Sequence, residues 1–213
     1  MLLRLVPFLV LLLLALEVSA QVAEIPSRAI PTGKAEVTAL SISPKDDHVL
    51  VGLNNGAALH HIESGKKVHA FTYAEDGGTA VYYVGFNDNG EFAVLIGRSG
   101  RRTVWNVATG KQDKMINPHR WIPDPRAVKA MGLDMSNSTF DRFYQQKEVR
   151  IGDVLVRSVK NGSVEFVGTD GKVTRTLTFP ENKDQHHLAP LLLWEKYLLV
   201  GTDNGNVLFY DVL

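Results

Sequence analysis

The chain has 213 residues, and 23 lysines and arginines balance 23 aspartates and glutamates, so its formal net charge is zero. This balance argues against nucleic acid or another strongly charged polymer as the main partner. The sequence contains no cysteine, which excludes a disulfide framework and thiolate metal sites. It also lacks the glycine-rich phosphate-binding motifs, the zinc-protease motif and the nucleophile elbow, so no cofactor is expected and catalysis is disfavoured.

Residues 1–20 are typical of a signal peptide. Arg4 supplies the positive charge, and the apolar run from Leu5 to Leu16 that follows is shorter than a membrane span. Val18 and Ala20 are small residues at the positions that a signal peptidase reads, so we expect cleavage after Ala20. The alternative is an uncleaved anchor. We therefore expect a secreted or periplasmic protein, with no stable membrane span after cleavage.

The rest of the chain consists of four similar units. Each unit has an apolar strand, a tight turn that contains a glycine, and a second apolar strand. The turn glycines are Gly56, Gly100, Gly162 and Gly205. Two of their spacings, 44 and 43 residues, match a four-stranded repeat of roughly 40–45 residues. The third spacing, 62 residues, predicts one repeat plus an insertion at about residues 117–147. Three prolines within 117–125 favour a loop there, and a short helix is a candidate in the rest of the insertion.

The predicted strands are short apolar or alternating runs between turn residues. In the first unit they cover residues 37–43, 48–52, 58–62 and 67–71, and in the second unit 80–86, 91–96, 103–107 and 111–116. In the third unit they cover 154–159, 164–167 and 173–179, preceded by an inner strand for which 126–133 and 149–151 are both candidates. In the fourth unit they cover 188–194, 197–201 and 207–211.

The third strands of the second and fourth units share a characteristic pattern. One reads Gly-x-x-Thr-Val-Trp-Asn up to Asn106, and the other reads Asn-Gly-x-Val-x-Phe-Tyr-Asp up to Asp211. This pattern resembles the WD40 family of β-propeller repeats, in which a Trp-Asp dipeptide stands at Trp105-Asn106 and Tyr210-Asp211. The resemblance implies an all-β fold for about residues 35–213. It would be a WD40-like β-propeller of about four four-stranded blades, as a full or partial ring with one loop or short-helix insertion.

The ring needs a closing strand, because the fourth unit lacks a fourth strand. In the resembling family a strand from the other terminus commonly closes the ring. Residues 21–34 are the candidate segment here, through either Val22–Ile25 or Ala29–Ile30. Four blades are few for a closed ring. Two alternatives are therefore a homodimer that completes a larger ring and a fragment of a longer propeller chain.

The strongest local feature is a basic cluster that begins in the second unit and continues into the insertion. It includes an aromatic residue that would serve as a stacking anchor for an anionic peptide or glycan. The candidate binding residues are Arg98, Arg101, Arg102, Arg120, Trp121 and Arg126. The alternative interpretation is a set of solvated charges that protect sheet edges from pairing. By the resemblance, binding would use the propeller face that holds the turns between the second and third strands.

Metal and catalytic sites are not expected. His60-His61 and His186-His187 are adjacent pairs, and adjacent side chains on a strand point to opposite faces, so neither pair chelates a metal readily. Asp124, Asp134 and Asp141 in the insertion are the acid and base candidates, but such residues are ordinary surface composition. Trp105 and Trp194 lie in predicted strands and are expected in the core.

Two hypotheses for function follow. The first is an exported, non-catalytic interaction module that presents propeller loops to a protein partner. The alternative is a propeller enzyme or carbohydrate-binding domain that uses the insertion at 117–147 as its site.

Overall fold

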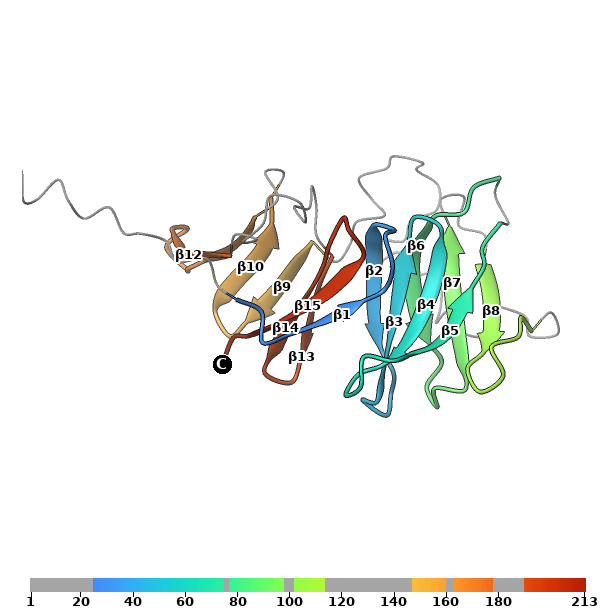
Figure 1. Ribbon diagram of the computed structural model, residues 1–213. Coiled ribbons are helices and arrows are strands. Elements are labelled where there is room, and N and C mark those ends of the chain that lie inside the picture. Colours follow the sequence, from blue (N-terminus) through green and yellow to red (C-terminus); the bar gives the residue numbers. More distant parts are fainter. Residues whose placement is uncertain (1–24, 75–76, 98–101, 114–146, 160–162, 178–189) are drawn as a thin grey trace, which may run out of the picture.

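The computed structural model describes residues 25–74, 77–97, 102–113, 147–159, 163–177 and 190–213. Every regular element within these ranges is a β-strand, and the strands form four antiparallel sheets (Figure 1). The expected all-β class is therefore confirmed. The predicted signal peptide and nearly all of the predicted insertion lie outside the described residues.

The four sheets follow the four predicted units, and each is a meander of neighbouring strands. Sheet 1 contains β2 (Val37–Ile42), β3 (His48–Leu53), β4 (Gly56–His61) and β5 (Lys67–Phe71). Sheet 2 contains β6 (Val81–Phe86), β7 (Phe92–Gly97) and β8 (Arg102–Asn106). Sheet 3 contains β9 (Glu148–Ile151), β10 (Val154–Ser158), β11 (Val164–Val167) and β12 (Val173–Leu177). Sheet 4 contains β13 (Leu191–Trp194), β14 (Tyr197–Gly201), β15 (Asn206–Asp211) and β1 (Arg28–Pro31).

The structure identifies the inner strand of sheet 3 and shows part of the predicted fourth strand of sheet 2. The inner strand of sheet 3 is β9, so the candidate at 149–151 forms it, and the candidate at 126–133 lies outside the described residues. In sheet 2 the predicted fourth strand is described only as far as Asp113. There a single bridge joins Gln112 to Trp105, and the amide of Asp113 donates to the carbonyl of Val104 at 2.8 Å.

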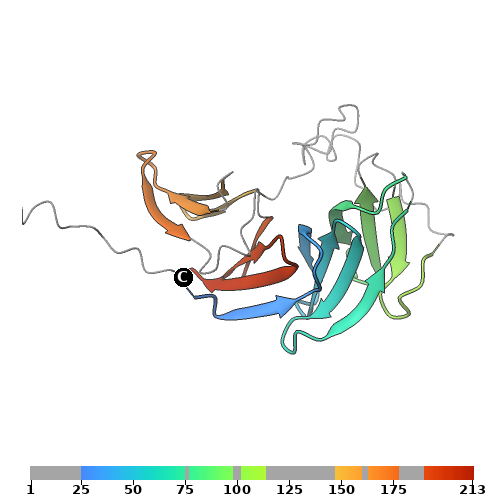
Figure 2. The same cartoon turned by 45° about the horizontal axis from the view of Figure 1, so that its top comes forward.

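The sheets stand side by side in an arc, in the order sheet 3, sheet 4, sheet 1, sheet 2 (Figures 1 and 2). β9 contacts β13, β13 contacts β2, and β2 contacts β6, so the first strand of each sheet lies beside the first strand of the next. Each sheet therefore extends outward from an inner strand, as the blades of a propeller do.

A separate apolar core fills each seam between neighbouring sheets. Leu199 and Phe209 of sheet 4 pack with Val37 and Val51 of sheet 1, whereas Leu198, next to Leu199 in β14, packs towards sheet 3. This division follows from the alternation of side chains along a strand. It explains why the central strands are apolar on both faces, and why no sheet is expected to be stable without its neighbours.

The N-terminal strand completes sheet 4. β1 pairs with β15 in antiparallel register, with Arg28 opposite Phe209 and Ile30 opposite Val207. Hydrogen bonds extend the pairing at both ends, from the amide of Ser27 to the carbonyl of Phe209 at 2.8 Å and from the amide of Thr32 to the carbonyl of Gly205 at 2.7 Å. The last blade is thus made from the two ends of the described chain.

His60 is a buried histidine on the same face of β4 as Ala58, which belongs to the core between sheets 4 and 1. It is only 2% exposed, and its Nδ1 lies 3.1 Å from the carbonyl oxygen of Gly65. Nδ1–H is therefore the donor, and Nε2 has no hydrogen-bond partner among the described residues. Burial lowers the pKa of His60 and nearby Lys67 lowers it further, against an opposing effect of the Gly65 hydrogen bond.

We expect this histidine to make the fold sensitive to acid. The unfolded chain takes up the proton at the ordinary histidine pKa of about 6.5, whereas folded His60 resists protonation, so the free energy of unfolding falls as the pH drops below that value. Urea denaturation at pH 7.5 and pH 5.5 should show a smaller acid-induced loss in His60→Leu than in the unchanged protein. His61→Leu, one residue further along β4, is the control. Equal acid sensitivity in the His60→Leu variant and the unchanged protein would contradict this assignment.

Candidate functional site

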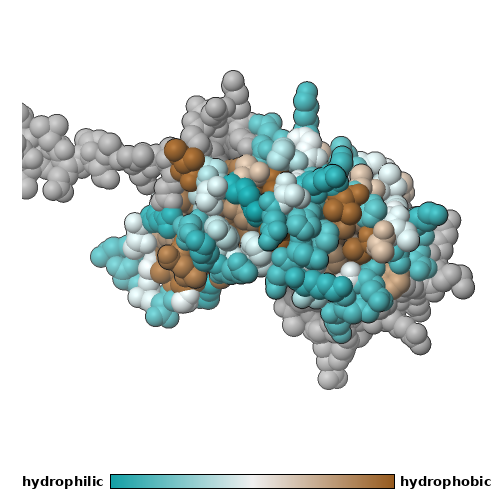
Figure 3. All heavy atoms as spheres, turned by 60° about the horizontal axis from the view of Figure 1, so that its bottom comes forward, coloured by the Kyte–Doolittle hydropathy of each residue, from teal (hydrophilic) through white to brown (hydrophobic). Residues whose placement is uncertain are grey.

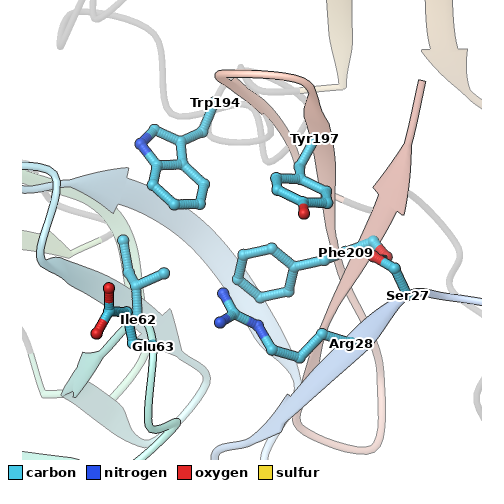
Figure 4. Close-up of a pocket in the computed structure, with 7 residues that line it drawn as sticks. All are labelled: Ser27, Arg28, Ile62, Glu63, Trp194, Tyr197 and Phe209. Atoms are coloured by element: carbon cyan, nitrogen blue, oxygen red, sulfur yellow. Dashed lines mark hydrogen bonds between the residues drawn. The ribbon is translucent and has the colours of Figure 1, made fainter. Parts of the chain in front are cut away.

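A pocket of about 310 Å³ lies at one end of the seam between sheet 4 and sheet 1 (Figure 4). Four separate parts of the chain line it: the start of β1, the residues after β4, the turn between β13 and β14, and β15. The lining residues are Ser27, Arg28, Ile62, Glu63, Trp194, Tyr197 and Phe209. The pocket therefore requires the N-terminal strand to be in place on the last blade.

Three aromatic rings form one wall of the pocket. Trp194 and Tyr197 stand directly opposite each other on either side of a two-residue turn, with ring centroids 6.1 Å apart and planes 22° apart. Phe209 meets both rings edge to face, at 6.4 Å from Trp194 and 6.1 Å from Tyr197. Stacked and edge-to-face pairs at these separations are the arrangements that aromatic rings prefer. Figure 4 shows the three rings grouped together, with Ile62 and Glu63 coming from the neighbouring sheet.

The turn between Trp194 and Tyr197 is fixed by polar contacts. Trp194 Nε1 donates to Asp46 Oδ1 at 3.0 Å, and because Asp46 belongs to the turn between β2 and β3, this bond joins sheet 4 to sheet 1. Within the turn, Lys196 forms an ion pair with Asp211 at 2.5 Å, and the hydrogen bond in this pair raises the pKa of Lys196 and lowers that of Asp211. Lys196 Nζ also lies 5.1 Å from the centroid of the Tyr197 ring.

Two charged side chains face the pocket. The guanidinium carbon of Arg28 lies 4.2 Å from the centroid of the Phe209 ring, in a cation–π contact (Figure 4). Glu63 comes from the turn after β4 and is exposed. No ion pair between described residues includes either side chain. The pocket thus combines an aromatic wall, one arginine and one carboxylate. This composition suits binding through packing and directed polar contacts.

The architecture around the pocket has three features of a propeller. The sheets are antiparallel meanders, their inner strands lie side by side, and the N-terminal strand completes the last sheet. The fold is that of a WD40-like β-propeller, built as a partial ring. In this propeller the pocket lies between the last blade (sheet 4) and the first blade (sheet 1).

Comparison with known proteins gives similarity to solved structures alone, since no protein-family model and no curated protein matches the chain. A structure described as the WD40 repeats of RRP9 is 15% identical with a TM-score of 0.39, over 84% of this chain and 48% of that one. A structure of U3-55K is 16% identical with a TM-score of 0.37, over 81% of this chain and 47% of that one. The computationally designed protein Ika8 is 16% identical with a TM-score of 0.30, over 83% and 46%. The propeller described here spans about half the length of these structures.

The pocket lies at the opposite end of the blades from the turns that the family resemblance had favoured. It opens near the turns that follow β2, β4 and β13, whereas the Asn54-Asn55 and Asp203-Asn204 turns lie at the other ends of their strands. Figure 3 views the molecule from the pocket side and shows a mainly hydrophilic surface with separate hydrophobic groups.

The basic cluster predicted from the sequence is described only at Arg102. Arg98, Arg101, Arg120, Trp121 and Arg126 lie outside the described residues. Arg102 begins β8 opposite Ile96, its Nη1 is buried without a partner among the described residues, and burial lowers the pKa of its guanidinium. Arg102 therefore belongs to sheet 2 and does not line the pocket.

The sequence interpretation named none of the seven residues that line the pocket as a binding residue, and Trp194 is the one for which it made a different prediction. It was expected in the core, but it is half-buried and lines the pocket. Trp105 does lie in the core, at 7% exposure, with its Nε1 donating to Thr103 Oγ1 at 2.8 Å. The available signal was local: Trp194 and Tyr197 flank a two-residue turn, which places two aromatic side chains on one face at a blade end.

Most of the histidines and aspartates that were considered for metal binding or catalysis lie outside the described residues. In the part of the chain that the structure describes, no group of three histidine, cysteine, aspartate or glutamate residues is placed to hold a metal ion. His186, His187, Asp124, Asp134 and Asp141 lie outside that part.

Among the residues that the structure describes, there is no helix with the length and apolar character to cross a membrane.

Proposed function

We propose that this propeller is an exported, non-catalytic interaction module, and that the pocket between its last and first blades is a docking point for a protein partner. The observation that carries the proposal is the gathering of Trp194, Tyr197, Phe209 and Arg28 around an open pocket. Tryptophan, tyrosine and arginine are the residue types that dominate binding energy in protein interfaces.

The scaffold supports this role physically. Phe209 and Ile62 are each 1% exposed, so two of the residues that line the pocket are anchored in the core between sheets 4 and 1. Trp194 and Tyr197 are half-buried and pack against the same core. Rings held in this way lose little side-chain freedom on binding, which lowers the entropic cost of docking.

Export in this proposal rests on the signal-peptide pattern of residues 1–20. Completion of the ring by a second copy, which the small number of blades suggests, stays a prediction.

Replacing Trp194 with alanine should weaken docking strongly without unfolding the protein. Peptides selected from a random displayed library against the full chain should bind at least about thirty-fold more weakly to Trp194→Ala, which corresponds to about 2 kcal/mol. Leu193→Ala is the matched control, because Leu193 is the adjacent residue of β13, is 36% exposed and points to the opposite face. Fluorescence anisotropy of the selected peptides measures the difference.

Two results would count against the proposal. If every selected peptide binds Trp194→Ala and the unchanged protein equally, the pocket is not the docking point. If a neutral oligosaccharide binds with Trp194 dependence and no peptide does, the carbohydrate-binding alternative replaces the protein-docking function. Urea denaturation of both variants establishes that they are folded.

A further inference from the structure

We propose that the pocket is selective for acidic peptide segments, in which an apolar side chain contacts the aromatic wall while a neighbouring carboxylate pairs with Arg28. This inference rests on the proposed docking function and adds the chemistry of the segment that is bound. It comes from the placement of charges around the three rings.

The rings already carry two cations. The Arg28 guanidinium covers a face of Phe209 at 4.2 Å, and the Lys196 ammonium lies 5.1 Å from the Tyr197 centroid. Aromatic faces attract cations through their negative quadrupole. A ligand lysine or a quaternary ammonium group would meet the positive charge of Arg28 at the wall, so Arg28 disfavours cationic ligands on the Phe209 side of the pocket.

Arg28 is the cation that remains available for a ligand. Lys196 is paired with Asp211 at 2.5 Å, whereas no ion pair between described residues includes Arg28. The N–H groups of a guanidinium lie in its plane and match the two oxygens of a carboxylate, so Arg28 can bind a ligand carboxylate beside its contact with Phe209. The backbone of Arg28 is fixed opposite Phe209 by the pairing of β1 with β15.

Glu63 gives the inference its sharpest test. It lines the same pocket and is exposed in the turn after β4, without an ion pair to Arg28. A carboxylate at this place repels an acidic ligand and attracts a basic one. Affinity should therefore change in opposite directions when the charge of Arg28 is removed and when the charge of Glu63 is removed. The directions of these two affinity changes together show whether the ligand is acidic or basic.

The size of the pocket agrees with a short segment. A volume of about 310 Å³ stands at the lower end of the range for ligand pockets, which is suitable for one large side chain and its neighbour. Trp194 and Tyr197 provide the apolar wall, and Ile62 provides the facing contact from sheet 1.

The test uses the full chain and three fluorescein-labelled peptides of equal length. Each peptide has one central phenylalanine, flanked by aspartates in the first peptide, asparagines in the second and lysines in the third. Anisotropy titrations should show the tightest binding for the aspartate peptide. Arg28→Gln should weaken it about tenfold or more, and Glu63→Gln should tighten it about two- to threefold, because Glu63 is exposed and screened.

Controls separate charge recognition from damage to the fold. Arg28→Lys keeps the charge but loses the two-pronged geometry, so we expect affinity between that of Arg28→Gln and that of the unchanged protein. Arg157→Gln removes an arginine that pairs with Glu165 on sheet 3, away from the pocket, and should leave affinity unchanged. Urea midpoints of Arg28→Gln and Arg28→Lys that equal the midpoint of the unchanged protein show that β1 remains in place.

The outcomes separate this inference from the function on which it rests. Preference for the lysine peptide, or reversed signs for Arg28→Gln and Glu63→Gln, overturns the acidic selectivity while Trp194-dependent binding keeps the docking function. Equal binding of all three peptides also overturns it. Failure of every probe to bind overturns the inference, and the library selection with Trp194→Ala then decides the docking function separately.

Discussion

Ile30→Ala should lower the free energy of unfolding by about 2–5 kcal/mol, the range for truncating a fully buried isoleucine. Ile30 is 0% exposed and belongs to the core between the last and first blades. Its Cγ1 would lie 3.7 Å from a Cβ placed on Gly65 of sheet 1, so this one side chain of β1 reaches across the seam. The loss should therefore weaken both the closing strand and the contact between blades.

The chain supplies a control of the same residue type on the same segment. Ile25 is 84% exposed, so Ile25→Ala should change stability by no more than about 0.5 kcal/mol. Urea denaturation followed by tryptophan fluorescence measures both variants. If Ile30→Ala were as stable as Ile25→Ala, the N-terminal strand would contribute nothing to holding the partial ring together.

Gly56→Ala should be the most damaging single-methyl addition in sheet 1, with a loss of about 2–4 kcal/mol from backbone strain and steric overlap. Gly56 has a φ of 132°, a conformation that residues with a Cβ rarely adopt. An added Cβ would also lie 2.5 Å from the carbonyl oxygen of Phe71 on the edge strand β5. Since that oxygen belongs to the backbone, relief requires movement of the strand.

The variant Gly152→Ala separates backbone strain from steric overlap. Gly152 has a φ of 57° in the turn between β9 and β10, but an added Cβ there would meet nothing within 4 Å. This variant should lose only about 1 kcal/mol, the strain of a left-handed alanine. Thermal unfolding of the two variants gives the comparison, and equal losses would mean that the contact with Phe71 is relieved at no cost.

Within one blade, the residue pattern predicted the positions of most strands. Strands β2 to β5 fall within one or two residues of their predicted positions, as do β14 and β15. This agreement has a simple reason. Each of these strands pairs with a strand next to it in the sequence, and the turn residues between them set the register; only β15 also pairs with a distant strand, β1. The inner strand of the third blade could not be assigned from the residues, because 126–133 and 149–151 both fit the local pattern of a strand.

Contacts between blades could not be predicted from local patterns. The candidate site joins Arg28, Ile62 and Trp194, which are far apart in the sequence, and no local spacing predicts their meeting. The basic cluster around Arg102 was conspicuous because its members are close in the sequence. Closeness along the chain does not place side chains in one pocket, and the described part of that cluster lies on another sheet.

The amino-acid sequence by itself determined that this protein is a repeated antiparallel β structure of four blade-like units, because alternation of apolar residues and turn glycines act over a few neighbouring residues. Only the tertiary structure decided which N-terminal residues complete the last sheet, in what order the sheets stand, and where three aromatic rings and an arginine meet. These features depend on packing between segments that are distant in the sequence. The free energy of that packing comes from how well two assembled sheets fit together, so the residue pattern of one sheet alone does not predict it.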